Sequence, residues 1–159
     1  MKRVFAFVVL VVLALACSGL MLAKGTADSL IGSWKLNSAK STFSPGPAPK
    51  SQALKYEMQG DELEVTADTV NADGTTQHEA YGAKFDGKEY LINGDPDRDS
   101  ATMRRIDAYT TEVVGKKGAK PTVTFRRVVS KDGKTLTLRE TGTNGKGQKV
   151  SNVAVYDKE

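Results

Sequence analysis

The feature that most constrains the fold is a series of turn signals that recurs at short intervals after residue 52. They are Gly60-Asp61, Asp73-Gly74, Asp86-Gly87, Asn93-Gly94, Asp107-Ala108, Gly115 to Gly118, Asp132-Gly133 and Asn144-Gly145. Asp-Gly and Asn-Gly favour tight hairpin turns, because both central positions of such a turn need positive φ. Between the turns apolar residues alternate with period two, as in Leu54, Tyr56 and Met58. This alternation is typical of half-buried strands, so we expect an all-β chain.

The turns divide the chain into ten expected strands. Their ranges are 31–37, 52–59, 62–71, 75–85, 88–93, 100–106, 109–115, 121–130, 134–143 and 149–157. Strands joined by tight turns pair with their sequence neighbours, and closure into a barrel removes the exposed edges. Turn spacing alone fits a barrel or a sandwich equally well. Because no long Greek-key return is available, we predict an antiparallel up-and-down meander barrel of about 8–10 strands.

One connection is long, and it runs from Ser38 to Ser51. Pro45, Pro47 and Pro49 occupy alternate positions in it, which favours an extended polyproline II path. The segment could recognise a partner protein or carry the chain across one end of the barrel. We favour the second interpretation and call residues 38–50 the strap.

The N-terminus has the pattern of an export signal. Lys2 and Arg3 precede an apolar run from Val4 to Ala16, and small residues at Gly25 and Ala27 suit a cleavage site. We therefore predict a signal peptide at 1–27, a barrel domain at 28–159 and a periplasmic or secreted protein. A retained membrane anchor is the alternative, because the apolar run could just span a bilayer.

Cys17 offers a second way to reach a membrane. Ala14-Leu15-Ala16-Cys17 resembles the lipoprotein box of bacteria, in which the cysteine becomes lipidated. The alternative localisation is thus a lipoprotein anchored at Cys17. Membrane contact is expected only through the signal peptide or through this lipidation.

Charge and cysteine content narrow the function classes. Lys2, Arg3 and Lys24 leave 20 of 23 basic residues and all 19 acidic residues in 28–159, a formal net charge of +1. A basic footprint for nucleic acid is absent from this composition. The same range contains no cysteine, which excludes a disulfide framework, a thiolate nucleophile and a cysteine metal site. The sequence makes no prediction of oligomeric state.

Register places two charged residues on an apolar face. A two-residue turn at Asp132-Gly133 pairs Arg127 with Leu138 and Phe125 with Glu140. A second turn around Gly145-Lys146 then sets Leu138 opposite Val153 and Leu136 opposite Val155. The expected face consists of Val123, Phe125, Arg127, Val129, Leu136, Leu138, Glu140, Val153 and Val155. Inward Arg127 and Glu140 would form polar contacts in a ligand cavity or a structural ion pair, unless a register slip turns them outward.

Motifs for catalysis and metal binding are missing or incomplete. His78, the single histidine, lies on a strand face that we expect to be exposed. The loop Asn93 to Ser100 alternates carboxylates but lacks the glycine and the terminal glutamate of an EF-hand, so an acidic, solvated turn is favoured. No Gly-x-Ser-x-Gly is present. We predict a protein that is not an enzyme and that has no cofactor and no metal site.

Three segments carry a resemblance to known proteins. Gly32-x-Trp34 on the first expected strand resembles the signature of the lipocalin and calycin group. The whole opening from Gly32 to Ser51 is similar to small secreted bacterial proteins called lipocalin-like, as are Val128 to Thr137 and Asn152 to Tyr156. The resemblance implies a lipocalin-like barrel in which Trp34 closes the floor.

The resemblance also bears on the ligand. Fatty-acid-binding relatives hold a carboxylate with Arg-x-Tyr on the last strand, where this chain has Ala154-Val155-Tyr156. That constellation is therefore absent here. We predict a barrel that binds a small, mainly apolar ligand, with a ligand-free envelope structural or interaction module as the alternative. The predicted ligand-binding residues are Tyr81, Phe85, Met103, Phe125, Arg127, Leu138 and Glu140.

Overall fold

The computed structural model describes residues 28–159, and the predicted signal peptide and Cys17 lie outside this range. Ten strands and one short 3-10 helix make up the described chain. They are β1 (Gly32–Leu36), η1 (Ser38–Lys40), β2 (Ser51–Gln59), β3 (Glu62–Val70), β4 (Thr76–Ala83), β5 (Asp86–Leu91), β6 (Ser100–Arg105), β7 (Thr110–Lys117), β8 (Lys120–Val129), β9 (Thr135–Thr143) and β10 (Lys149–Lys158). All ten predicted strands are confirmed, with ends that differ by a few residues.

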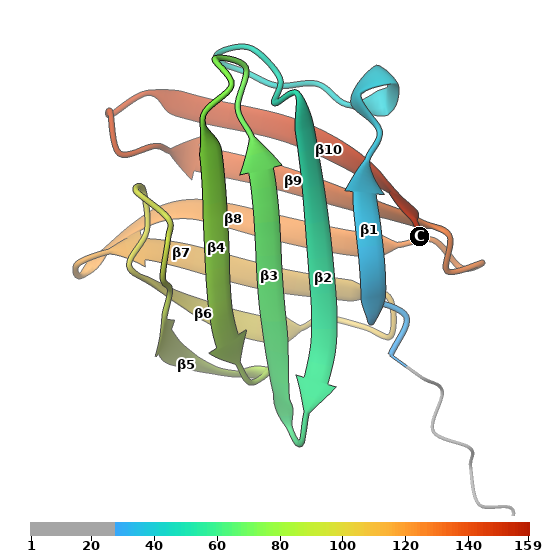
Figure 1. Cartoon of the computed structure of the whole chain (residues 1–159). Helices are drawn as coiled ribbons and strands as arrows, with labels where there is room; N and C mark the ends of the chain where they lie inside the picture. Colours follow the sequence, from blue (N-terminus) through green and yellow to red (C-terminus); the bar gives the residue numbers. More distant parts are fainter. Residues whose placement is uncertain (1–27) are drawn as a thin grey trace, which may run out of the picture.

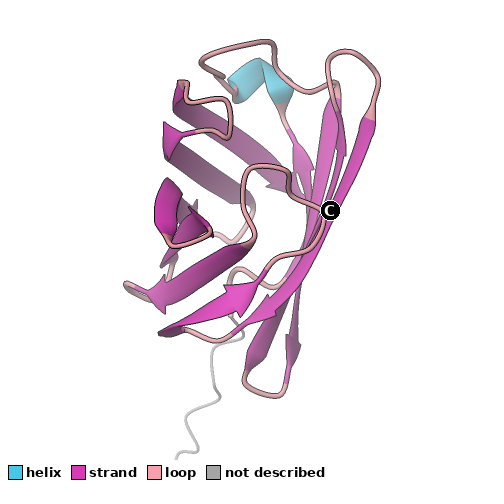
Figure 2. Ribbon diagram, turned by 90° about the vertical axis from the view of Figure 1, so that its left-hand side faces the viewer, coloured by secondary structure: helices cyan, strands magenta, loops and turns pink. Residues whose placement is uncertain are grey.

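The strands form one antiparallel sheet that curls into a nearly closed barrel (Figure 1). Its order is β4-β3-β2-β1-β10-β9-β8-β7-β6-β5, so the first and last strands in sequence are neighbours. Figure 1 shows β1 to β4 as a front wall whose strands cross those of the rear wall, and Figure 2 shows the two walls from the side. Among residues 28–159, no helix is long and apolar enough to cross a membrane.

The expectation that every strand pairs with its neighbour in sequence is wrong for β4 and β5. No ladder joins them, and a single bridge connects Ala80 to Asn93 beyond the end of β5. The backbone approaches closely at this bridge, because a Cβ added to Gly94 would lie 1.9 Å from the carbonyl oxygen of His78. The barrel therefore has one seam, which residues 92–99 between β5 and β6 cover.

The predicted register between β8 and β9 is confirmed, whereas that between β9 and β10 is wrong by one residue. Arg127 pairs with Leu138 and Phe125 with Glu140, but Leu138 faces Ala154 instead of Val153. The cause is a longer turn. Asn144 accepts hydrogen bonds from the amides of Lys146 and Gln148 through its side chain, and Gly147 has a φ of 75°. The inner face of β10 is therefore formed by Asn152, Ala154 and Tyr156, while Val153 and Val155 face outward.

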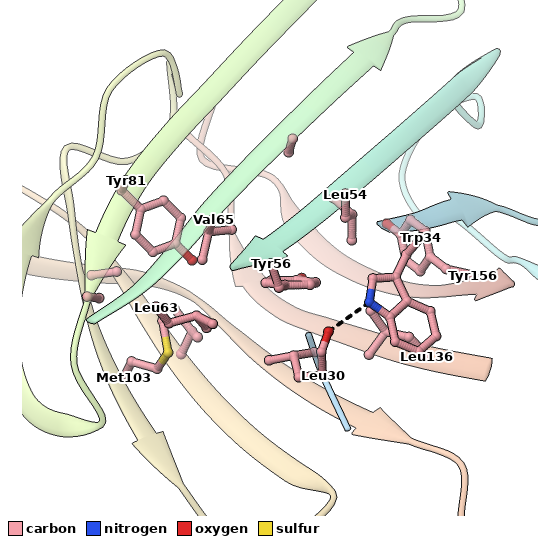
Figure 3. Packing of buried hydrophobic residues seen from close by; sticks show 14 of the residues in the cluster. Leu30, Trp34, Leu54, Tyr56, Leu63, Val65, Tyr81, Met103, Leu136 and Tyr156 are labelled. Atoms are coloured by element: carbon pink, nitrogen blue, oxygen red, sulfur yellow. Dashed lines mark hydrogen bonds between the residues drawn. The ribbon is translucent and has the colours of Figure 1, made fainter. Parts of the chain in front are cut away.

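One end of the barrel is filled by side chains. Trp34 is fully buried, and its indole N–H donates to the carbonyl oxygen of Leu30 at 2.9 Å (Figure 3). Leu63, Met103 and Leu136 also have no exposed surface and pack in the same cluster. The structural role predicted for Trp34 is thus confirmed: it packs in the core and closes the floor, as a large aromatic side chain with a satisfied N–H does best.

The strap crosses the opposite end, as predicted (Figure 1). Thr42 forms a bridge with Val153, and the Ser151 amide donates to the carbonyl oxygen of Ser44 at 2.7 Å. The Ser44 amide donates to the side-chain oxygen of Asn152 at 2.8 Å. The strap is therefore fixed to β10. It pairs with the stretch of β10 that comes just before the residues paired with β1.

Candidate functional site

A cavity of about 460 Å³ occupies the end of the barrel that lies under the strap. Its walls come from the inner faces of β2, β3, β4, β8, β9 and β10. Phe43, Pro47 and Pro49 of the strap line its mouth, together with the β3–β4 turn and residues 95–98. The volume falls in the usual range of small-molecule pockets, about 300–1,000 Å³. The two ends of the barrel thus differ, one packed and one hollow.

Four of the seven predicted ligand-binding residues line this cavity: Phe125, Arg127, Leu138 and Glu140. The other three lie elsewhere. Tyr81 and Met103 are buried in the packed cluster, where Figure 3 shows them, and Phe85 is partly buried with the Arg105 guanidinium 4.2 Å from its ring centre. Tyr81 still affects the cavity, because its hydroxyl group accepts a hydrogen bond from the cavity residue Arg127.

Arg127 is the most unusual residue of the cavity. Its side chain extends from β8 into the interior and is only 5% exposed. One terminal nitrogen, Nη2, donates to the hydroxyl of Tyr81 at 2.8 Å, and the guanidinium lies 5.1 Å from the ring centre of Tyr56. Within residues 28–159, Nε and Nη1 have no hydrogen-bond partner. Among residues 28–159, no carboxylate lies within ion-pair distance of it.

The side chains around Arg127 do not supply the missing hydrogen-bond partners. Thr111 is its register partner on β7, and the buried Thr111 hydroxyl likewise has no hydrogen-bond partner in the described part of the chain. Burial raises the pKa of Tyr56 to about 12 and that of Tyr156 still further, so both stay neutral. A buried guanidinium remains protonated and is costly to leave unpaired. The site therefore has two donor nitrogens, Nε and Nη1, that no described residue binds.

Arg98 lies at the same cavity in the opposite situation. Its Nη2 donates to both carboxylate oxygens of Glu79 at 2.9 Å, and its Nε donates to Asp95 at 2.7 Å. The guanidinium also stacks 4.5 Å from the ring centre of Phe125. Burial raises the pKa of Glu79, which the charge of Arg98 only partly offsets. The ion pairs of this cluster connect β4 to residues 92–99 and so hold the two sides of the seam together.

The Arg98 cluster corrects the interpretation of residues 93–100 as a solvated acidic turn. Asp95 accepts from the amides of Asp97 and Arg98, and the side chains of Asp95 and Arg98 are only 10% and 7% exposed. The sequence pattern could have revealed one residue of this cluster, Glu79. Glu79 lies two residues before Tyr81 on one strand, so both must face inward.

Glu140 lies on β9 diagonally across from Arg127, but the two do not form the ion pair considered from the sequence. The hydrogen-bond partner of Glu140 is Asn152, whose amide nitrogen donates to Oε2 at 2.7 Å. Burial raises the pKa of Glu140. The cavity thus contains an unpaired cation and an unpaired carboxylate on adjacent strands.

The single histidine, His78, lies outside the cavity. His78 is exposed, as predicted, and its Nδ1 lies 2.6 Å from Asp68 on the outer face of the barrel. No group of three or more histidine, cysteine or acidic side chains in 28–159 is arranged to hold a metal ion.

Comparison with known proteins identifies the fold. No family model matches the sequence, and no curated protein does. Among solved structures the chain is similar to zebrafish ileal bile acid-binding protein in complex with cholic acid, with a TM-score of 0.50 and 12% sequence identity. The match covers 82% of this chain and 99% of that one. The chain has a calycin fold, with ten antiparallel up-and-down strands in a nearly closed barrel.

Proposed function

We propose that this chain is an exported binding protein whose barrel holds a small, mainly apolar ligand with an acidic group. The observation that carries the proposal is the Arg127 guanidinium, which is buried at the cavity wall with two donor nitrogens, Nε and Nη1, unpaired among residues 28–159. A carboxylate, sulfonate or phosphate placed there would accept both donors and neutralise the charge. Phe125, Leu138 and Val123 provide apolar contacts for the rest of the ligand.

The comparison supports the same class of ligand. The zebrafish protein was crystallised with cholic acid. The strap lies over the mouth of the cavity, where Phe43, Pro47 and Pro49 line it. Export is supported by the apolar leader with its basic start and small-residue end. We expect N-terminal sequencing of protein recovered from the medium or periplasm to give a chain that starts at Asp28.

Substitution of Arg127 tests the function. The purified protein is titrated with 1-anilinonaphthalene-8-sulfonate, an apolar anion, and the bound probe is displaced with decanoate. Arg127→Met should weaken both by about tenfold to a hundredfold, because charge-assisted hydrogen bonds are lost. Arg126→Met is the matched control, since Arg126 is next on β8 and exposed. Equal affinities in Arg127→Met and the wild type would contradict the role of Arg127, whereas no binding of either ligand to the wild type would favour the ligand-free module.

A further inference from the structure

The carboxylate of Glu140 is the second unmatched charge of the cavity. It lines the cavity from β9, and its Oε2 atom is held by the amide nitrogen of Asn152. Oε1 has no hydrogen-bond partner among residues 28–159, and no basic side chain of that range forms an ion pair with it. Asn152 is itself fixed, because its oxygen accepts from the Ser44 amide. The carboxylate is therefore oriented on one side and free on the other.

The charges that line the cavity are out of balance around Glu140. The cavity is lined by the acids Asp73, Glu79, Asp95, Asp97 and Glu140 and by the bases Arg98 and Arg127. Arg98 is fully engaged by two of those acids. Asp73 accepts from Thr75 and Asp97 from the amide of Gly145, and both lie near the mouth. Among residues 28–159, Glu140 and Asp97 are both partly buried acids with no cation and one donor each, but Asp97 lies in the loop at the mouth whereas Glu140 lies on the inner face of β9.

We infer that Glu140, oriented by Asn152, forms a second polar subsite that selects ligands carrying a hydroxyl or ammonium donor as well as the acidic group. This inference rests on the proposed function, because Arg127 holds the acidic group. Arg127 faces Leu138 and Glu140 faces Phe125, so Glu140 lies one inward-facing pair nearer the mouth. The donor would therefore lie further from the floor than the acidic group.

The two subsites together predict that a simple fatty acid binds more weakly than an acid that also carries a donor. An alkyl chain laid along β9 would cover Glu140 and desolvate its carboxylate without providing a hydrogen bond. A hydroxyl or ammonium at that point supplies the missing donor to Oε1. Hydrogen bonds to a charged group are about twice as strong as neutral ones, so a preference of about tenfold is expected.

Three ligands with one carbon skeleton measure this preference: decanoate, ω-hydroxydecanoate and ω-aminodecanoate, with the shorter octanoate and hexanoate series to vary the spacing. Each displaces 1-anilinonaphthalene-8-sulfonate from the full protein. In the wild type we expect the hydroxy or amino member of at least one series to bind about tenfold more tightly than the parent acid. The hydroxyl and ammonium arms distinguish the two donor classes.

Two variants connect the preference to Glu140. Glu140→Gln keeps the shape and a hydrogen bond with Asn152, so it should abolish a preference for ammonium and reduce one for hydroxyl. Glu140→Met should abolish both and strengthen binding of decanoate, because no carboxylate then faces the chain. Glu57→Gln is the matched control on the outer face of β2, where the glutamate pairs with Lys55. Circular dichroism verifies that each variant is folded.

The possible outcomes distinguish a failure of this inference from a failure of the proposed function. If decanoate binds through Arg127 but every donor-bearing derivative binds no better, the subsite is wrong and the function stands. If none of the acids binds, both are wrong. Decylamine, measured in the same displacement assay, lacks the acidic group; if it binds as tightly as ω-aminodecanoate, Arg127 does not hold an acid and the proposed function is wrong. An unchanged preference in Glu140→Met would overturn the inference even if the preference itself exists.

Discussion

Two buried arginines face one cavity, and their surroundings are opposite. Arg98 at the seam is bound by Glu79 and Asp95 and stacks on Phe125, so its charge is fully used by the protein. Arg127 on the inner wall has one neutral partner, and two of its nitrogens are unpaired within the described residues. Burial is nearly equal for the two side chains, at 7% and 5% exposed. The difference teaches that burial of a charge does not define its role; the presence or absence of a partner does.

The largest expected effect is the loss of the satisfied arginine. Arg98→Met leaves Glu79 and Asp95 without their cation, and breaking a buried pair in this way costs about 3–5 kcal/mol in the free energy of unfolding. Urea denaturation followed by circular dichroism measures it. Arg104→Met, at an exposed position of β6, is the control. A loss below about 1 kcal/mol would remove the contrast between the two arginines.

The same substitution at Arg127 should have the opposite sign. No carboxylate is abandoned, and an unpaired buried charge is replaced by an apolar side chain. Arg127→Met is therefore expected to be neutral or to raise the free energy of unfolding by on the order of 1 kcal/mol. The same urea experiment compares the two variants directly. Destabilisation of Arg127→Met comparable to that of Arg98→Met would indicate a structural cation and weaken the proposed binding role.

The smallest expected effect is a pH dependence caused by Glu140. Burial raises the pKa of this carboxyl above its ordinary value of 4.5, so the folded state binds a proton more readily than the unfolded state. Its ionisation therefore opposes folding, and this cost appears as pH rises from 4.5 through the raised pKa. Glu140→Gln should be as stable as the wild type near pH 4 and more stable near pH 7. Parallel stability curves for the two proteins over this range would contradict the expected desolvation.

Much of the barrel followed from local patterns in the sequence. The Asp-Gly and Asn-Gly turns located the strands, and the Asp132-Gly133 hairpin alone gave the register that turns Arg127 and Glu140 inward. The register of β10 was wrong because Asn144 organises a longer turn through its side chain, which the dipeptide Asn144-Gly145 does not reveal. A single residue of turn length reverses which face each side chain takes.

The contacts that define the site were harder to predict. Arg127 meets Tyr81 across 46 residues of sequence, and no periodic pattern encodes that contact. Arg98 lies in a loop, where alternation gives no direction for a side chain. The seam between β4 and β5 was also hidden, because two strands joined by a short turn normally pair and here they diverge.

Asn152 gives the barrel a property that neither of its neighbours has alone. Through one side chain it holds both the strap, at the Ser44 amide, and the carboxylate of Glu140. Under the proposed function, a ligand that changes the Glu140 contact would also change the free energy with which Asn152 holds the strap, and the coupling would be reciprocal. Under the proposed function, release of the ligand and attachment of the strap would be coupled by a free energy on the order of one or two hydrogen bonds.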